Sequence, residues 1–193
     1  AGGADGGRRR GARARHRRRM SLVPPGGTIG ILGGGQLGRM SALAAGRLGY
    51  RCHVLAPEAE SPAGEVAARF VRAEWDDMAA LDAFADGVDV VTLEFENVPV
   101  PAVERIARRR PVRPGAGVLA VTQDRVAEKS FVNAAGIGTA DWRPVASAAD
   151  LARARESLGG RCIVKTARMG YDGKGQVAVG PADDPAAAWA GLR

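Results

Sequence analysis

The sequence predicts an α/β protein in which a parallel-sheet domain is followed by a second, α+β unit. Three observations lead to this prediction. Short apolar runs alternate with stretches whose apolar residues recur at helical spacing. This alternation is typical of parallel strands joined by helices that cover both faces of one sheet. Further along the chain, two apolar runs flank a glycine-rich loop, which indicates that the second strand turns back beside the first.

The first unit is expected to hold up to five strands separated by helices. Four strands are predicted from short runs rich in apolar residues, at residues 28–32, 51–55, 68–71 and 88–96, and a short fifth strand is predicted at 110–114. Its helices are predicted at residues 37–48, at 78–85 and from Pro99 onward, because proline is well tolerated in a first helical turn. The first helix carries an apolar face made of Leu37, Met40, Leu43, Ala44 and Leu48.

A linker is predicted at residues 115–125, where the apolar pattern becomes less regular. Asp124 can cap a following helix that ends at Gly136 and Gly138. The rest of the second unit is expected to contain strands at 142–145, 162–165 and 176–179, and helices at 148–158 and from Asp184 onward. The expected division is a tail at 1–19, a first domain at 20–118 and the start of a second domain at 119–193, ending inside a helical pattern.

The net charge of +7 lies in the amino-terminal tail. Residues 1–19 hold eight arginines and one acid, so the chain from Met20 onward is neutral and does not predict nucleic-acid binding. We expect this tail to be disordered and Met20 to be the true start; a polyanion-binding arm is the alternative. The chain has no apolar run of about 18 residues and only two cysteines, which favours a cytoplasmic protein without a membrane span.

The first glycine cluster, GGGQLG, fits the G-x-G-x-x-G pattern as Gly33, Gly35 and Gly38 between a strand and a helix. Such a turn can present free backbone amides to a phosphate. A dinucleotide site also needs an acid at the end of the second strand, where this chain has Ala56 and Pro57. The pattern therefore disfavours NAD and leaves an anionic or polar ligand, or a purely structural turn, as the alternatives.

Two carboxylates follow the strand predicted at 88–96. Glu94 and Glu96 stand two positions apart in TLEFENV, a spacing that places both side chains on one face of an extended strand. The carboxyl ends of parallel strands are where open α/β sheets bind ligands. A solvated strand end without a ligand is an equally good interpretation of the spacing alone.

The second glycine cluster is cationic. Lys165 closes an apolar strand, and GYDGKG then leads into the next strand with Tyr171, Asp172 and Lys174. Glycine amides and two cations are suited to the phosphates of a nucleoside triphosphate. A simple hairpin turn would need the glycines but not these side chains, so we favour a phosphate-binding loop that is not of the Walker type.

Four stretches together carry a resemblance to a known family. GILGGGQLGRM, DVVTLEFENVP, QDRVAEKSF and GYDGKGQ resemble, in order and spacing, the amino-terminal half of the 5-(carboxyamino)imidazole ribonucleotide synthases, ATP-grasp enzymes of purine biosynthesis. The resemblance runs from about residue 28 to the end of the chain. It implies a pre-ATP-grasp, Rossmann-like domain followed by an incomplete ATP-grasp lid unit.

The resemblance implies ATP-dependent carboxylation of 5-aminoimidazole ribonucleotide with bicarbonate, releasing ADP and phosphate. It also implies Mg²⁺ as a cofactor, with its ligands and the catalytic residues beyond residue 193. On this basis the chain alone is expected to be inactive, and the complete enzyme is expected to be a cytoplasmic homodimer. Three alternatives stay open: another ATP-grasp carboxylase or ligase, an NAD-dependent oxidoreductase, and nucleic-acid binding through the tail.

The resemblance also implies roles for particular residues. Its ATP-contacting positions correspond to Arg125, Lys165, Gly170, Tyr171, Asp172, Gly173, Lys174, Gly175 and Gln176. Its ribonucleotide-contacting positions correspond to Gln36, Leu37, Glu94, Glu96 and Tyr171. Met169 stands where the family commonly has a glycine, which leaves the resting conformation of the loop open.

Overall fold

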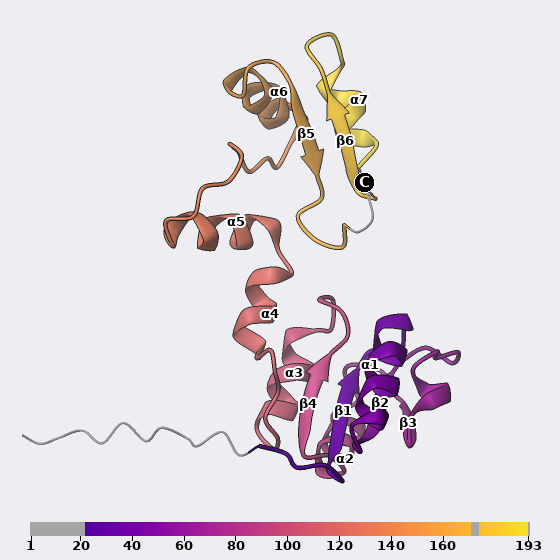
Figure 1. Ribbon diagram of the computed structural model, residues 1–193. Helices are drawn as coiled ribbons and strands as arrows, with labels where there is room; N and C mark the ends of the chain where they lie inside the picture. The colour runs from indigo at the N-terminus through magenta and orange to yellow at the C-terminus, as the bar shows by residue number, and fades with distance from the viewer. Residues whose placement is uncertain (1–21, 171–173, 193) are drawn as a thin grey trace, which may run out of the picture.

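The computed structural model describes residues 22–170 and 174–192. Its first unit is built on a four-stranded sheet (Figure 1). The strands lie in the order β3-β2-β1-β4, and every neighbouring pair is parallel. Their bounds are Thr28–Leu32 for β1, Arg51–Ala56 for β2, Arg69–Arg72 for β3 and Val90–Leu93 for β4. The parallel-sheet α/β prediction is confirmed, and β1 ends at the glycine turn that begins the first helix.

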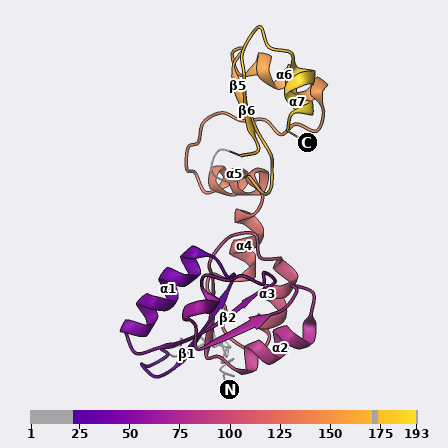
Figure 2. The ribbon, with the colours of Figure 1, turned by 90° about the vertical axis from the view of Figure 1, so that its right-hand side faces the viewer.

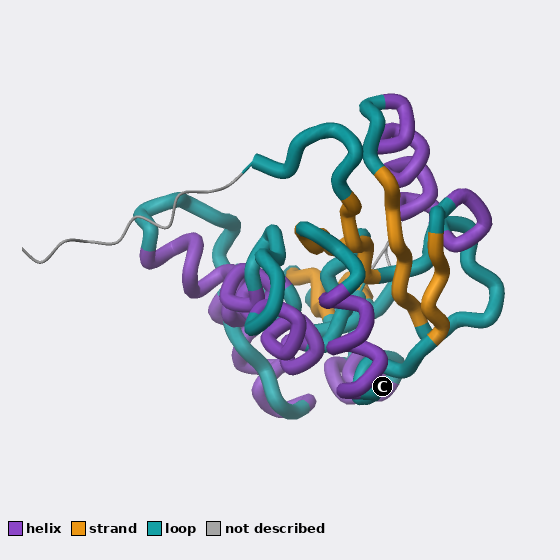
Figure 3. The backbone as a smooth tube through the Cα atoms, turned by 90° about the horizontal axis from the view of Figure 1, so that it is seen from below, coloured by secondary structure: helices purple, strands orange, loops and turns teal. Residues whose placement is uncertain are grey.

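Helices cover both faces of this sheet (Figures 2 and 3). One face carries α1 (Gln36–Arg47) and a short 3₁₀ turn, η1 (Gly64–Val66). The other carries α2 (Met78–Asp86) and α3 (Val100–Ala107). Successive residues of a strand point to opposite faces, so Ile31 packs in the core beneath α1, whereas Leu32 joins the larger core beneath α2 and α3.

The apolar face predicted for the first helix does not enter the core. α1 buries only its two small residues, Gly38 and Ala42. Leu37, Met40 and Leu43 are each at least 50% exposed. Because small side chains let the helix lie close to the sheet, α1 packs through its narrow face and turns the larger apolar side chains outward.

Four features differ from the sequence-based expectation. The fourth strand ends at Leu93, and the run at 110–114 forms only a single bridge, between Val91 and Val112. The expected linker contains a helix, α4 (Ala116–Thr122), which buries Leu119 against the first core. No strand forms at 142–145, because this segment has no strand partner and the indole of Trp142 donates a hydrogen bond to Asn133 instead.

The second unit begins with α5 (Arg125–Ala134), which Asp124 caps as predicted. α6 (Ala148–Ser157) precedes an antiparallel pair made of β5 (Cys162–Lys165) and β6 (Gln176–Val179), and α7 (Pro185–Ala190) follows. Its buried core is small and centres on Leu151, Val164 and Val179. Across the two described ranges, no helix has the length and apolar character needed to cross a membrane.

Candidate functional site

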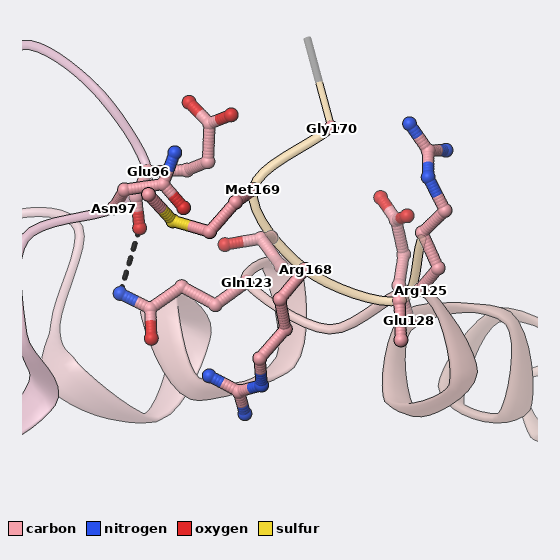
Figure 4. Close-up of a pocket in the computed structure, with 10 residues that line it drawn as sticks. Glu96, Asn97, Gln123, Arg125, Glu128, Arg168, Met169 and Gly170 are labelled. Carbon is pink, nitrogen blue, oxygen red and sulfur yellow. Dashed lines mark hydrogen bonds between the residues drawn. The ribbon is translucent and has the colours of Figure 1, made fainter. Parts of the chain in front are cut away.

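A cavity of about 310 Å³ opens where the two units meet (Figure 4). Three segments form its walls: the loop after β4, the connection between α4 and α5, and the chain that leaves β5. The lining residues are Glu96, Asn97, Thr122, Gln123, Arg125, Glu128, Ala167, Arg168, Met169 and Gly170. The cavity therefore joins residues that are up to 74 positions apart in the sequence.

The charged groups of the cavity come in both signs. Glu96 and Glu128 contribute carboxylates, while Arg125 and Arg168 contribute guanidinium groups. Arg168 forms an ion pair with Asp124, with Nε 3.2 Å from Oδ2. Within the part that the structure describes, the guanidinium of Arg125 has no hydrogen-bond or ion-pair partner, so it is available to an anionic ligand.

The two carboxylates after β4 have different surroundings. Glu94 accepts hydrogen bonds from the backbone of the glycine turn, at 2.9 Å from Gly35 N and 2.5 Å from Gly38 N. Glu96 is exposed and lines the cavity instead. The strand ends at Leu93, so the alternation of an extended strand does not govern these two positions.

The glycine turn before α1 is occupied by the Glu94 side chain. A Cβ atom added at Gly35 or Gly38 would lie 2.5 Å from a Glu94 carboxylate oxygen, so only glycine leaves room for this carboxylate. Its negative charge also meets the positive end of the α1 dipole. An internal carboxylate thus takes the amides that a dinucleotide phosphate would need, which argues against NAD at this turn. Gln36 and Leu37 lie in the first turn of α1 and are exposed, outside the cavity lining.

The second glycine cluster follows the end of β5. Lys165 is exposed and pairs in register with Gln176 across the two-stranded sheet. Thr166 N donates to Gly175 O at 2.8 Å, which closes the base of the loop. Gly170 reaches the cavity wall, and Lys174 belongs to the same loop. The predicted contacts Tyr171, Asp172 and Gly173 lie outside the described residues.

Two residues of this loop have strained or unsatisfied features. Met169 has a positive φ of 61°, a conformation that costs a non-glycine residue about 1–3 kcal/mol. The hydroxyl of Thr166 is buried and has no hydrogen-bond partner among the described residues. A Cβ atom at Gly175 would approach this hydroxyl to 2.5 Å, and one at Gly170 to 3.0 Å. At Gly175 the close approach and a positive φ of 65° both favour glycine, whereas at Gly170 the Thr166 hydroxyl would only have to shift slightly.

The cavity unites residues from two separate predictions. Arg125 and Gly170 were expected at ATP, and Glu96 at the ribonucleotide, and all three line one cavity. Sequence reasoning missed Gln123 and Arg168, although both lie beside residues that it singled out. Among residues 22–170 and 174–192, no three histidine, cysteine or acidic side chains are grouped so that they could hold a metal ion.

Comparison with known proteins gives matches along both units. Residues 27–123 match the model of the ribonucleotide synthetase preATP-grasp domain, and residues 130–193 match the ATP-grasp domain. A curated relative from Brucella melitensis, an N5-carboxyaminoimidazole ribonucleotide synthase, is 50% identical over 162 residues, which are 84% of this chain and 45% of the relative. The chain thus spans less than half the length of this relative.

Solved structures of similar proteins agree with these matches. The Staphylococcus aureus N5-carboxyaminoimidazole synthetase in complex with ADP has a TM-score of 0.81 and 37% identity, over 88% of this chain and 45% of that one. The Aspergillus clavatus N5-carboxyaminoimidazole synthase, in complex with ADP and 5-aminoimidazole ribonucleotide, has a TM-score of 0.75 and 30% identity, over 86% and 44% of the two chains.

Proposed function

The chain belongs to the family of the ribonucleotide synthetase preATP-grasp domain, and on this premise we propose that it serves ATP-dependent carboxylation of 5-aminoimidazole ribonucleotide. In this reaction the γ-phosphoryl group of ATP passes to bicarbonate, which gives ADP and carboxyphosphate. The exocyclic amine of the ribonucleotide then attacks the activated carbon, or carbon dioxide released from it, and phosphate leaves. The product is 5-(carboxyamino)imidazole ribonucleotide, an intermediate of purine biosynthesis made in the cytoplasm.

One observation carries the proposal: a single cavity is lined by both units. Its first wall carries Glu96 from the loop after β4, at the carboxyl end of the parallel sheet. Its second wall carries Gly170, at the start of the glycine-rich loop, and Arg125, the first residue of α5, lines the cavity beside this wall. A nucleotide held by the second unit and an amine held by the first would meet in this cavity, as the transfer of a carboxyl group between them requires.

The residues divide into two groups in this proposal. Arg125, Lys165 and Lys174 place positive charge near the phosphates, where it offsets the charge that develops during phosphoryl transfer. The backbone of residues 170–176 covers the same phosphates. Glu96, with Tyr171, orients the ribonucleotide, and Gln36 and Leu37 border that substrate at the start of α1. Glu94 acts indirectly, because its carboxylate fixes the turn that carries Gln36.

We further propose that the first domain spans residues 20–118 and that the ATP-grasp domain starts at 119, with the complete enzyme a homodimer. ATP would bring Mg²⁺ to the site. The described residues offer no group of three suitable side chains to hold this ion, so none of them is assigned to it.

The proposal is tested by replacing Lys165 with alanine in an enzyme that contains this chain and has the full length of its relatives. We expect the half-saturating concentration of ATP to rise and turnover to fall by about 100-fold, because a cation facing the phosphates is lost. Lys129→Ala is the matched control, since Lys129 lies on α5 outside the cavity lining, and within the described residues its ammonium donates to the carbonyl of Ala140. Equal kinetics of the Lys165 and Lys129 variants would contradict the assignment of Lys165.

A further inference from the structure

Three consecutive residues, Gln123, Asp124 and Arg125, connect α4 to α5, and we refer to them as the junction tripeptide. They contact the other two segments that line the cavity, the loop after β4 (the first wall) and the chain that leaves β5 (the second wall). Gln123 and Asp124 have no assigned role in the reaction. Both are partly buried, and both form side-chain hydrogen bonds to segments distant in sequence.

Gln123 holds the first wall. Its side-chain amide donates to the backbone carbonyl of Glu96 at 2.7 Å (Figure 4) and to that of Val98 at 2.6 Å. A primary amide has two N–H donors, and here both point to the loop after β4. The two bonds span the segment that carries Glu96, so the backbone position of this carboxylate depends on a side chain 27 residues further along the chain.

Asp124 and Arg125 hold the second wall. Asp124 caps α5 through Oδ1, which accepts from Val126 N at 2.9 Å and from Ala127 N at 3.1 Å. Its other oxygen, Oδ2, accepts from Arg168 Nε at 3.2 Å. The backbone N–H of Arg125 donates to the carbonyl of Ala167 at 2.9 Å. These contacts attach the chain leaving β5 to the first turn of α5.

We propose that the junction tripeptide sets the spacing between the two walls, with Gln123 positioning the wall that carries Glu96 and Asp124 positioning the wall that carries Arg168. Under the proposed function, Gln123 therefore acts on the ribonucleotide and Asp124 on the nucleotide, although neither needs to touch a substrate. Both are positioning residues, and their effects are separable because each bonds to a different wall.

Hydrogen exchange in the chain itself tests the positioning directly. Gln123→Glu removes both donors and sets a carboxylate against two carbonyl oxygens, so we expect amides in residues 94–98 to exchange about tenfold faster. Asp124→Asn keeps an acceptor for the cap but sets an amide against Arg168, so we expect faster exchange in residues 166–169. Val118→Ala is the control, because Val118 lies on α4, is 53% exposed and is outside the cavity lining.

Each variant is first required to have the circular dichroism spectrum of the parent chain. The proposed positioning is overturned if either variant speeds exchange equally in residues 94–98 and 166–169, or in neither. A variant that fails to fold is replaced by a milder one, Gln123→Asn or Asp124→Ser, which weakens the same contact with a smaller side chain. The criterion is again faster exchange in one wall and not in the other.

Steady-state kinetics of an enzyme that contains this chain and has the full length of its relatives test whether the two positioning residues affect the reaction. We expect Gln123→Glu to raise the half-saturating concentration of 5-aminoimidazole ribonucleotide about tenfold while that of ATP changes less than about threefold. Asp124→Asn should show the reverse pattern. A merely structural role would raise both constants together or lower only kcat, and either result overturns the assignment. Selective exchange changes without any ribonucleotide-dependent turnover of the parent enzyme would instead contradict the proposed function and leave the positioning in place.

Discussion

Glu94 and Glu96 are close in sequence and chemically identical, yet their environments predict different effects of substitution on stability. Glu94→Gln replaces one of two acceptor oxygens by an amide that cannot accept from the backbone of the glycine turn. An unsatisfied, partly buried N–H costs about 1–3 kcal/mol, so we expect the free energy of unfolding to fall by that amount. Glu96→Gln, at an exposed position, should leave stability unchanged. Urea denaturation of both variants measures the difference, and equal stabilities would contradict the role given to Glu94.

Two glycines of α1 provide a second contrast. A Cβ atom at Gly38 would lie 2.5 Å from Glu94 Oε2 and 3.1 Å from Ala63 Cβ, whereas one at Gly46 would meet nothing within 4 Å. We expect Gly38→Ala to destabilise the protein and Gly46→Ala to stabilise it by about 0.5–1 kcal/mol, because alanine is the better helix former. Thermal unfolding of the two variants gives the sign of each effect. A neutral Gly38→Ala would show that the carboxylate is not held in this turn.

At the level of elements, an ion-pair cluster joins α2 to α3. Asp82 of α2 accepts from Arg105 Nε at 2.7 Å and from Arg109 Nη2 at 3.0 Å, both on α3 or just after it. The hydrogen bond from Arg105, followed by that from Arg109, lowers the pKa of Asp82 from 3.8 to about 2. A carboxylate with a lowered pKa stabilises the folded state above its unfolded pKa, and this contribution is lost as the pH falls through the folded value.

We therefore expect the parent chain to lose melting temperature more steeply than Asp82→Asn between pH 3.8 and about 2, with the difference between them closing at the acid end. Asp76→Asn is the control and should follow the parent, because Asp76 is exposed and forms no ion pair with the described residues. Parallel curves for the parent and Asp82→Asn would show that the cluster does not link the two helices.

The elements that could be predicted are those fixed by local pattern. β1, β2 and β3 follow continuous apolar runs, and Asp124 and Asp184 cap helices at the predicted places. The segment at 142–145 is interrupted by Arg143 and Pro144 and has no partner strand. Strand pairing is a long-range property that no single run contains. α4 was missed because Gly115 and Gly117 weaken its helical pattern, while the burial of Leu119 favours the helix.

The site was predicted in part for the same reason. Glu96, Arg125 and Gly170 belong to motifs, and the structure gathers them around one cavity. The role of Gln123 has no local signal, because it depends on two backbone carbonyls 25 and 27 residues away. The exposure of the apolar face of α1 could not be predicted either, because periodicity identifies an apolar face without indicating whether another element covers it.

For the whole molecule, the two units should differ in stability. The first unit buries side chains on both faces of a parallel sheet, whereas the second buries mainly Leu151, Val164 and Val179. We expect slow hydrogen exchange in β1, β2 and β4 and faster exchange in β5 and β6, because local opening follows the amount of packed core. Mass spectrometry of exchanged peptides resolves the two groups. Equal protection in β1 and β5 would contradict this division.

Under the proposed function, one cavity brings together a nucleotide held by the second unit and an amine held by the first. The decisive measurement is phosphate release from ATP in the presence of bicarbonate, with and without 5-aminoimidazole ribonucleotide, by an enzyme that contains this chain and has the full length of its relatives. We expect release that depends on the ribonucleotide and that falls by about tenfold or more in Arg125→Ala, because this variant removes a cavity guanidinium that has no partner among the described residues. Phosphate release that does not depend on the ribonucleotide, or that is unchanged in Arg125→Ala, would contradict the function proposed for this cavity.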